Sequence, residues 1–200
     1  MLEPLLEFFR ARMPLSAADE ELVRSVVRGR HVVKGETLQR AGDVATHGYF
    51  VGKGLLRSFW IDEKGREHVL TFAPEGWWLT DLSSMRDGTP ATYFIEALED
   101  SDLVLLDHLA QTRFMSEIPG FAAAFATGLQ RLNAAREKRL LDSLSATAEQ
   151  RYLNFLEKYP SIARRVPQHM LASYLGLTPE TLSRLRGQLA RRKRAKPGAV

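Results

Sequence analysis

The sequence predicts an α+β protein that is built from a small N-terminal β-barrel, one long helix and a C-terminal helix-turn-helix. The first observation is a series of short β-rich runs, separated by glycine turns, between residues 31 and 106. The second is a stretch at residues 114–144 whose apolar side chains recur every three or four positions. The third is a pair of short helical patterns that meet at Gly176, within residues 166–189.

The barrel is expected from the spacing of the β-rich runs. Two helices precede it, one at residues 2–9 and one at residues 16–27, where Ser16 and Asp19 form a capping box. The runs that follow are evenly spaced and bounded by glycine turns, which favours a small antiparallel barrel or jelly roll. They lie at residues 31–33, 37–39, 47–51, 55–61, 68–72, 93–98 and 103–106.

The long apolar stripe predicts a single helix over residues 114–144. Such a helix presents more apolar surface than a small barrel can cover, so a second copy of the chain is its natural partner. The expected dimer contacts are Phe125, Leu129, Leu132 and Leu140.

A second capping box marks the boundary between the domains. Thr147 and Gln150 start a new helix that ends at Pro160. The predicted parts are a barrel domain at residues 1–113, a dimerisation helix and hinge at residues 114–145, and a helix-turn-helix domain at residues 146–200.

The two C-terminal helical patterns have clear start and stop signals. The first helix follows Pro167 and ends at Gly176, where a left-handed backbone is easily tolerated. The second helix starts at once, because Thr178 is a hydroxyl N-cap and Pro179 suits the first helical position. Its inward face consists of Leu182, Leu185 and Leu189.

The other face of the second helix is polar. Outside the leucine face lie Glu180, Thr181, Ser183, Arg184 and Gly187. Hydrogen-bonding side chains on the outward face of the second helix are typical of a recognition helix that enters the major groove of DNA. The alternative is a helical hairpin whose exposed arginine contacts no DNA.

The charge distribution supports a nucleic-acid target. Residues 151–200 carry eleven Lys or Arg against two acidic residues, a net charge of +9, whereas the whole chain is +4. The preceding part is therefore −5, and an acidic body joined to a basic end is the electrostatic pattern of a nucleic-acid-binding module. The basic run at residues 191–196 either contacts phosphates or aids solubility.

Composition argues against several other classes of protein. The chain has 200 residues and 44% apolar content, and no run approaches the roughly 20 apolar residues of a membrane span. The absence of cysteine excludes disulfides and thiolate-held iron–sulfur clusters. The five histidines show no metal-ligating spacing and no catalytic cluster joins them, so we expect no metal, cofactor or enzyme activity. No secretory signal is apparent, and the cytoplasm is the expected location.

In its order of parts, the chain resembles the Crp/Fnr (catabolite activator and fumarate–nitrate regulator) superfamily of bacterial transcription factors over nearly its whole length. The segment at residues 178–184, TPETLSR, looks like the recognition-helix motif of that family. The resemblance implies a cyclic-nucleotide-binding-like barrel (a double-stranded β-helix or jelly roll), a long dimerisation helix and a C-terminal winged helix-turn-helix.

By this resemblance, Glu180 and Arg184 are the specificity residues. Arginine can donate two hydrogen bonds to O6 and N7 of guanine, and glutamate can accept one from N4 of cytosine. Contacts to the DNA backbone fix the register without reading the sequence. They are expected from Gln168, Thr178, Thr181 and Ser183, and Arg186 completes the DNA-binding set.

The effector pocket departs from the family pattern. In members that bind cyclic AMP, a Gly-Glu pair holds the ribose and an Arg-Ser/Thr pair about ten residues on holds the cyclic phosphate. The corresponding positions here are read as Gly76-Trp77 and Ala91-Thr92, so neither cyclic AMP nor cyclic GMP is expected to bind. Either tryptophans fill the pocket, or it takes a different small molecule. Its expected lining is Gly76, Trp77, Trp78, Thr92, Asn133, Arg136 and Glu137.

We therefore predict a homodimeric, sequence-specific transcriptional regulator that binds a palindromic DNA site and has RNA polymerase as a further partner. One alternative is a small-molecule sensor that signals through protein partners without binding promoters, and another is a barrel enzyme with a docking hairpin. The basic C-terminal segment and the outward Arg184 argue against the first alternative. The lack of a polar catalytic cluster argues against the second.

Overall fold

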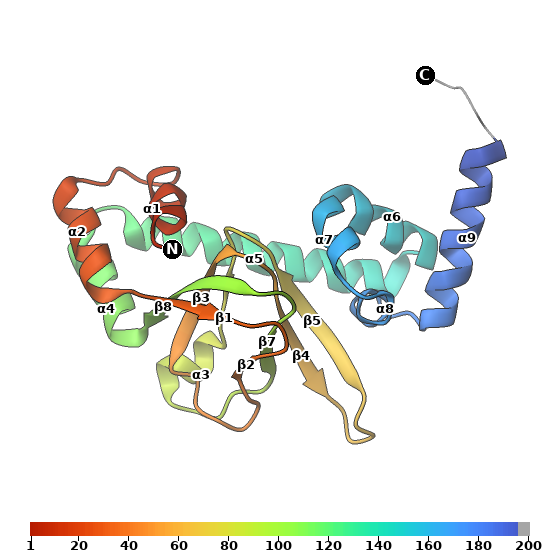
Figure 1. Ribbon diagram of the computed structural model, residues 1–200, viewed down its shortest axis with the longest axis horizontal. Helices are drawn as coiled ribbons and strands as arrows, with labels where there is room; N and C mark the ends of the chain where they lie inside the picture. Colours follow the sequence, from red (N-terminus) through yellow and green to blue (C-terminus); the bar gives the residue numbers. More distant parts are fainter. Residues whose placement is uncertain (196–200) are drawn as a thin grey trace.

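The computed structural model describes the backbone of residues 1–195 and the side chains of residues 1–192. Figure 1 shows a β-barrel with helices at one end, a separate group of helices at the C-terminus, and one long helix that reaches from the first part to the second. This mixture of antiparallel sheets and helices confirms the α+β class. Lys196 of the basic run lies outside the described residues.

The barrel consists of two four-stranded antiparallel sheets. The strand orders are β1-β8-β3-β6 and β2-β7-β4-β5, so neighbouring strands are often distant in sequence, as in a jelly roll. Leu56, Ile95 and Leu103 are fully buried between the sheets. The strands are β1 (Arg28–Val32), β2 (Thr37–Gln39), β3 (His47–Lys53), β4 (Leu56–Ile61), β5 (Glu67–Ala73), β6 (Trp78–Leu79), β7 (Phe94–Ala97) and β8 (Ser101–Asp107).

Each expected β-rich run overlaps a strand, but two elements between β5 and β7 were not predicted. The strand β6 is too short to show an alternating pattern. The helix α3 (Leu82–Asp87) is equally short, and Asp81 caps it by accepting a hydrogen bond from the backbone N–H of Ser84 at 3.2 Å. Asp81 lies between these two elements and is buried.

Three helices close one end of the barrel. They are α1 (Glu3–Arg10), α2 (Ala17–Val26) and α4 (His108–Glu117). Phe50 of β3 and Phe114 of α4 are both fully buried in the apolar cluster that these helices form. The predicted capping box is confirmed in α2. The backbone N–H of Ser16 donates to the side chain of Asp19, and the backbone N–H of Asp19 donates to the side chain of Ser16.

The prediction of one unbroken helix over residues 114–144 is wrong in its first turns. The long helix α5 (Phe121–Ser145) starts only after a break, and Phe114 belongs to α4. Pro119 disfavours the helical conformation of the residue before it. Gly120 has a positive φ of 83°, so the chain changes direction between α4 and α5. The apolar periodicity continued across the break because both helices pack on the same cluster.

The helix α5 has 25 residues and is therefore about 37 Å long. Phe121 is its one buried residue. Further along, the side chains of Leu140 and Leu144 are 60% and 76% exposed. A single chain therefore leaves the C-terminal part of the apolar stripe of α5 uncovered.

The C-terminal part contains α6 (Ala148–Lys158), α7 (Pro160–Arg165), α8 (Gln168–Leu175) and α9 (Pro179–Ala195). The capping box at the start of α6 is confirmed. The helix α7 was not predicted; it follows directly because a proline, which stops α6, is also favourable at a first helical position.

The predicted wing, which would be a β-hairpin beside the helix-turn-helix, is wrong for the described residues. Within residues 1–195 no strand follows β8, and α9 continues as a helix to Ala195. The sequence after Gly187 is rich in Gln, Leu, Ala and Arg, which favour helix over strand. No helix in the described part of the chain is long and apolar enough to cross a membrane.

Candidate nucleic-acid interface and effector region

The turn between α8 and α9 fixes the direction of α9. Gly176 ends α8 with a left-handed backbone at φ 67°, and the N–H of Leu177 donates to the carbonyl of Ala172 at 2.9 Å. The hydroxyl of Thr178 then accepts from the N–H of Thr181 at 3.2 Å and caps α9. The chain thus turns within three residues between the two helices.

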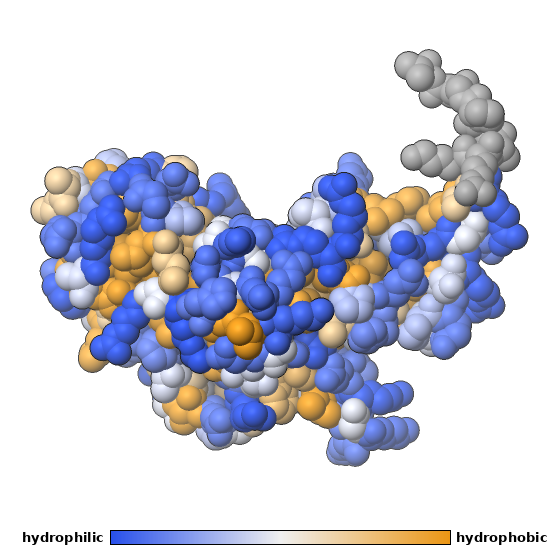
Figure 2. Space-filling view, in the orientation of Figure 1, coloured by the Kyte–Doolittle hydropathy of each residue, from blue (hydrophilic) through white to orange (hydrophobic). Residues whose placement is uncertain are grey.

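The leucines of α9 anchor it against the other C-terminal helices. Leu182 is fully buried and Leu185 is 7% exposed, both in a cluster with Phe155 and Leu171. This burial leaves the opposite face of α9 toward solvent. Figure 2 shows that this outer surface is predominantly hydrophilic.

The predicted DNA-binding residues lie in α8, in the turn and in α9. Gln168 is exposed at the start of α8, and Thr181 is half-buried beside the cap. The exposed residues of the turn and α9 are Thr178, Glu180, Ser183, Arg184 and Arg186. Six of the seven residues are therefore exposed, and Glu180, Ser183 and Arg184 lie on the side of α9 away from its buried leucines.

Charge on this surface is available for a partner. Among the described residues, Arg184 and Arg186 form no ion pair. Hydrogen bonding by backbone N–H at the start of α9 and by Thr178 lowers the pKa of Glu180, so its carboxylate remains an acceptor at neutral pH. The helix N-terminus stabilises the same negative charge.

The expected effector residues do not form one group. Gly76 lies in the turn before β6, and the ring of Trp77 lies 5.9 Å from that of Tyr159, between α6 and α7, facing the C-terminal helices. Trp78 instead packs against Phe50 at 5.3 Å, in the cluster at the closed end of the barrel. The two tryptophans therefore face different parts of the molecule and do not line one pocket together with Thr92.

Thr92 contacts Asp81, which was not among the expected effector residues. The backbone N–H and the hydroxyl of Thr92 donate to the Asp81 carboxylate at 3.1 and 3.3 Å. Asp81 is 7% exposed, while Ala91 beside Thr92 is 4% exposed and brings no charge. A buried acceptor is thus present near Thr92, and the pattern of Asp81 three residues before Ser84, an N-cap signal, could have located it.

The three residues expected from α5 are all exposed: Asn133, Arg136 and Glu137. Burial raises the pKa of the Tyr93 phenol, and the positive charge of Arg136 acts on it in the opposite sense. The charge of Arg136 therefore acts on the barrel at Tyr93, the residue after Thr92.

The predicted dimer residues follow one side of α5. Phe125 stacks on Phe121, with ring centroids 6.1 Å apart and an interplanar angle of 17°. Leu129 and Leu132 are half-buried and Leu140 is exposed. Leu141 and Leu144 extend the exposed apolar surface toward the C-terminal helices.

Comparison with known proteins shows what this chain is similar to. Residues 29–117 match the family of cyclic nucleotide-binding domains. The transcriptional regulatory protein Btr of Bordetella pertussis is 27% identical over 184 residues, which cover 86% of this chain and 74% of Btr. The transcriptional activator protein FnrA of Stutzerimonas stutzeri is 27% identical over 187 residues, which cover 86% of this chain and 75% of FnrA.

The solved structure of FixK2 from Bradyrhizobium japonicum shares the fold, with a TM-score of 0.72, 22% identity, and coverage of 84% of this chain and 86% of that chain. This chain is therefore similar to transcriptional regulators of the Crp/Fnr type over most of its length. It is a DNA-binding transcriptional regulator, and its Crp/Fnr relatives are regulators rather than enzymes.

The helix-turn-helix is held against the barrel by contacts that the sequence did not predict. The Arg165 guanidinium of α7 donates to both carboxylate oxygens of Glu75, at 2.8 and 2.9 Å, and to both of Glu99, at 2.9 and 2.7 Å. These carboxylates follow β5 and β7, respectively. From the sequence, Arg165 is only one of the eleven basic residues of the C-terminal segment. No residue close to it in the sequence indicates that it pairs with two distant glutamates.

Two further side chains tie α5 and α8 to the strand β5. The hydroxyl of Ser173 accepts from the N–H of Val69 at 2.9 Å and donates to the carbonyl of Glu67 at 3.1 Å, so it satisfies part of the exposed edge of β5. Arg139 donates to the carbonyls of Val69 and Tyr174 at 3.2 and 2.8 Å. We call these contacts, together with those of Arg165, the domain clamp.

Proposed function

We propose that this regulator acts as a homodimer that reads a palindromic DNA site with α9 of each subunit. The observation that carries the proposal is the two-sided character of α9. Leu182 and Leu185 are buried, while Glu180 and Arg184 are exposed and Arg184 has no ion pair among the described residues. A helix anchored on one side and free on the other, directly after a tight turn, suits insertion into the major groove.

The roles within the interface follow from chemistry. Arg184 is proposed to donate two hydrogen bonds to guanine, and Glu180 to accept one from cytosine. Gln168, Thr178, Thr181, Ser183 and Arg186 are proposed to contact the sugar-phosphate backbone. Backbone contacts add affinity for any sequence and are weakened by salt, whereas the two base contacts select the site.

Dimerisation is proposed to occur along α5. Its exposed leucines would lose contact with water when the same face of a second copy packs against them. The contacts are Phe125, Leu129, Leu132 and Leu140. Two-fold symmetry then makes the preferred site a palindrome with half-sites about 34 Å apart.

Cyclic AMP is not the proposed signal. Asp81 could accept from a ribose hydroxyl, but it already accepts from Thr92 and from the cap of α3. Ala91 supplies no cation for a phosphate, and Arg86, on nearby α3, is paired with Asp87 at 2.7 Å. A phosphate bound here would lack its charge-assisted hydrogen bonds. RNA polymerase is the further partner that we propose, and the cytoplasm the location.

The test is selection of binding sites from random DNA by the purified protein, followed by sedimentation of the complex. We expect recovered sites to be palindromic, two chains to bind each site, and binding to need no cyclic AMP. Cyclic AMP should bind weakly, because each charge-assisted hydrogen bond that its phosphate lacks costs about 1.5–3 kcal/mol, or about ten- to a hundredfold in affinity. Recovery of asymmetric sites by one chain would contradict the dimer, and operator binding that requires cyclic AMP would contradict our account of the pocket.

A further inference from the structure

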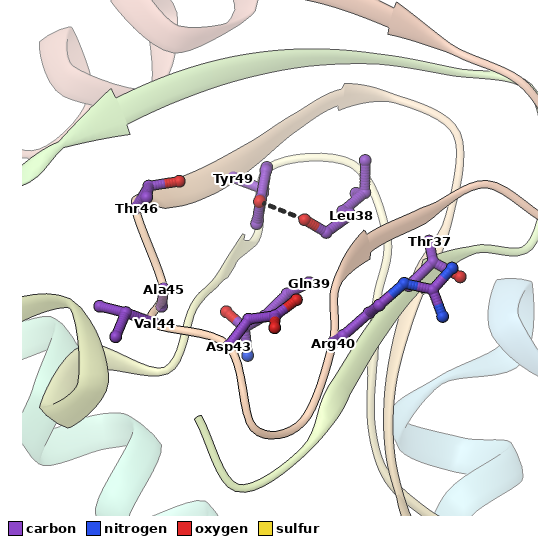
Figure 3. A pocket seen from close by; sticks show the side chains of 9 residues that line it. All are labelled: Thr37, Leu38, Gln39, Arg40, Asp43, Val44, Ala45, Thr46 and Tyr49. Atoms are coloured by element: carbon purple, nitrogen blue, oxygen red, sulfur yellow. Dashed lines mark hydrogen bonds between the residues drawn. The ribbon is translucent and has the colours of Figure 1, made fainter. Parts of the chain in front are cut away.

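A cavity opens on the rim of the barrel, away from the helix-turn-helix. It lies between β2, the loop at residues 40–46 and the start of β3, and has a volume of about 240 Å³ (Figure 3). Pockets for drug-sized ligands typically measure roughly 300–1,000 Å³. This cavity is therefore suited to a molecule smaller than a nucleotide, yet it is larger than a site for one water.

Gln39 contributes an unsatisfied acceptor to this cavity. Its side chain is one of the lining groups, and the residue is only 6% exposed. The Nε2 amide donates to the carbonyl of Tyr93 at 3.1 Å, whereas the buried Oε1 has no hydrogen-bond partner. Figure 3 shows the side chain extending across the middle of the cavity. Because buried acceptors are nearly always paired, the unpaired Oε1 indicates a hydrogen bond from a donor on a bound molecule.

Two opposite charges line the same cavity. Asp43 and Arg40 are both exposed, and neither side chain forms an ion pair or a hydrogen bond within the described residues. In Figure 3 the Asp43 carboxylate lies toward the middle of the cavity, and Arg40 extends toward Thr37. The cavity thus offers two acceptors on one side, a carboxylate and an amide oxygen, and a guanidinium with a hydroxyl on the other.

We propose that this cavity binds a small zwitterion, a free amino acid, through both of its charged groups. The ammonium group donates to Gln39 Oε1 and to the Asp43 carboxylate. The carboxylate of the amino acid accepts from Arg40 and from the hydroxyl of Thr37, because a guanidinium presents a planar fork that matches a carboxylate. This site is separate from the Ala91-Thr92 position, where a cyclic phosphate would be sought.

The cavity is connected to that position through the backbone. The N–H of Gly42 donates to the carbonyl of Ala91, and the N–H of Ala91 donates to the carbonyl of Asp43, both at 2.8 Å. Gln39 holds the carbonyl of Tyr93, two residues further on. A ligand that orders the loop at residues 40–46 therefore acts directly on residues 91–93, the segment that contacts Asp81. This inference goes beyond DNA binding, because it assigns a small-molecule ligand to the barrel.

The test is calorimetric titration of the full chain with glycine, L-alanine and L-serine. Ethanolamine, propionate and glycerol are the comparison ligands, which carry only the cation, only the anion, or neither. We expect saturable binding of at least one amino acid, and binding at least tenfold weaker for each comparison ligand. Arg40→Gln and Asp43→Asn should each weaken amino-acid binding about tenfold, or about 1.4 kcal/mol.

The control is Arg164→Gln, an exposed arginine of α7 without an ion pair among the described residues, which should leave the affinity unchanged. Both cavity substitutions are at exposed positions, so they test the site without disturbing the core. Absence of saturable binding for all three amino acids would overturn the proposal. Equal binding of ethanolamine or glycerol, or full affinity in both cavity variants, would overturn it as well.

Discussion

At the scale of single residues, Arg184 and Gln168 should play different roles on DNA. Both are exposed, but Arg184 lies on α9 and Gln168 at the start of α8. Arg184→Ala is expected to cost about 1–3 kcal/mol per half-site and to relax the preference at one base pair. Gln168→Ala should weaken all sequences alike. Competition between the selected palindrome and random duplex, at one salt concentration, measures both effects.

Arg164 provides the control for that prediction. It is an exposed arginine of the same domain, but it lies on α7 rather than on the recognition helix. Arg164→Ala should leave the ratio between specific and random binding unchanged. An equal loss for Arg184→Ala on both duplexes would show that Arg184 contacts phosphate and reads no base.

The same scale shows where sequence reasoning stopped. The exposed face of α9 could be predicted from helical periodicity and a cap, because both are local properties of the sequence. Asp81 and Arg165 were missed because their partners, Thr92, Glu75 and Glu99, are 11 to 90 residues away. No local pattern reports a pairing that exists only once the barrel has closed.

At the scale of elements, the cap of α6 should set part of the stability of the C-terminal domain. Thr147 accepts from the N–H of Gln150 at 3.2 Å, and its own N–H donates to the Gln150 side chain at 2.8 Å. Thr147→Ala is expected to lower the free energy of unfolding by about 1 kcal/mol. Thr127→Ala, which removes an exposed hydroxyl inside α5, is the matched control. Urea unfolding of both variants measures the difference, and equal losses would contradict a specific capping role.

The helix α5 carries the prediction for assembly. Leu132→Glu places a charge in the proposed seam between two copies and should yield monomers, because an unpaired buried charge is strongly unfavourable. Gln130→Glu adds the same charge on another side of α5, at an exposed position, and should leave the dimer intact. Sedimentation gives the mass of each. A stable Leu132→Glu dimer that still binds the palindrome would place the interface elsewhere.

Element boundaries were predictable where a local signal exists and not elsewhere. The capping boxes at Ser16 and Thr147 and the glycine turn at Gly176 were all confirmed. The break at Pro119-Gly120 was missed because the apolar spacing of the two flanking helices remained continuous through it. Proline and glycine together are the local signal that should have outweighed that periodicity.

At the scale of the whole molecule, the barrel and the helix-turn-helix are packed into one body. Aromatic rings join them, with Phe72 of β5 lying 5.3 Å from Tyr174 of α8. Leu55, Phe72 and Leu98 of the barrel share one apolar cluster with the C-terminal helices. Any change in the barrel that moves β5 therefore moves α8, and with it the direction of α9.

The domain clamp makes this coupling measurable. The Val69 N–H donates to Ser173 across the contact, so its hydrogen exchange reports separation of α8 from β5. Arg165→Gln leaves Glu75 and Glu99 without their cation. Because the Arg165 side chain is 23% exposed, we expect a cost between those of surface and buried pairs, about 1–2 kcal/mol. Exchange at Val69 should then become about ten times faster.

Acid should remove the difference between the native chain and this variant. Burial alone would raise the pKa of Glu75, but hydrogen bonds from Arg165 and from the backbone outweigh it and lower the pKa. A lowered folded-state pKa contributes stability that is present above the unfolded value, about 4.3, and is lost as the pH falls through the folded value. The ratio of Val69 exchange rates, corrected for intrinsic exchange, should therefore approach one below that range.

Arg164→Gln again serves as the control, since it removes a neighbouring arginine without touching either carboxylate. It should leave Val69 exchange unchanged at every pH. If Arg165→Gln also left that exchange unchanged at neutral pH, the aromatic contacts would hold the domains together by themselves. If its effect persisted undiminished in acid, the ionised carboxylates would not be what Arg165 holds, and the clamp would owe its strength to packing of the arginine side chain.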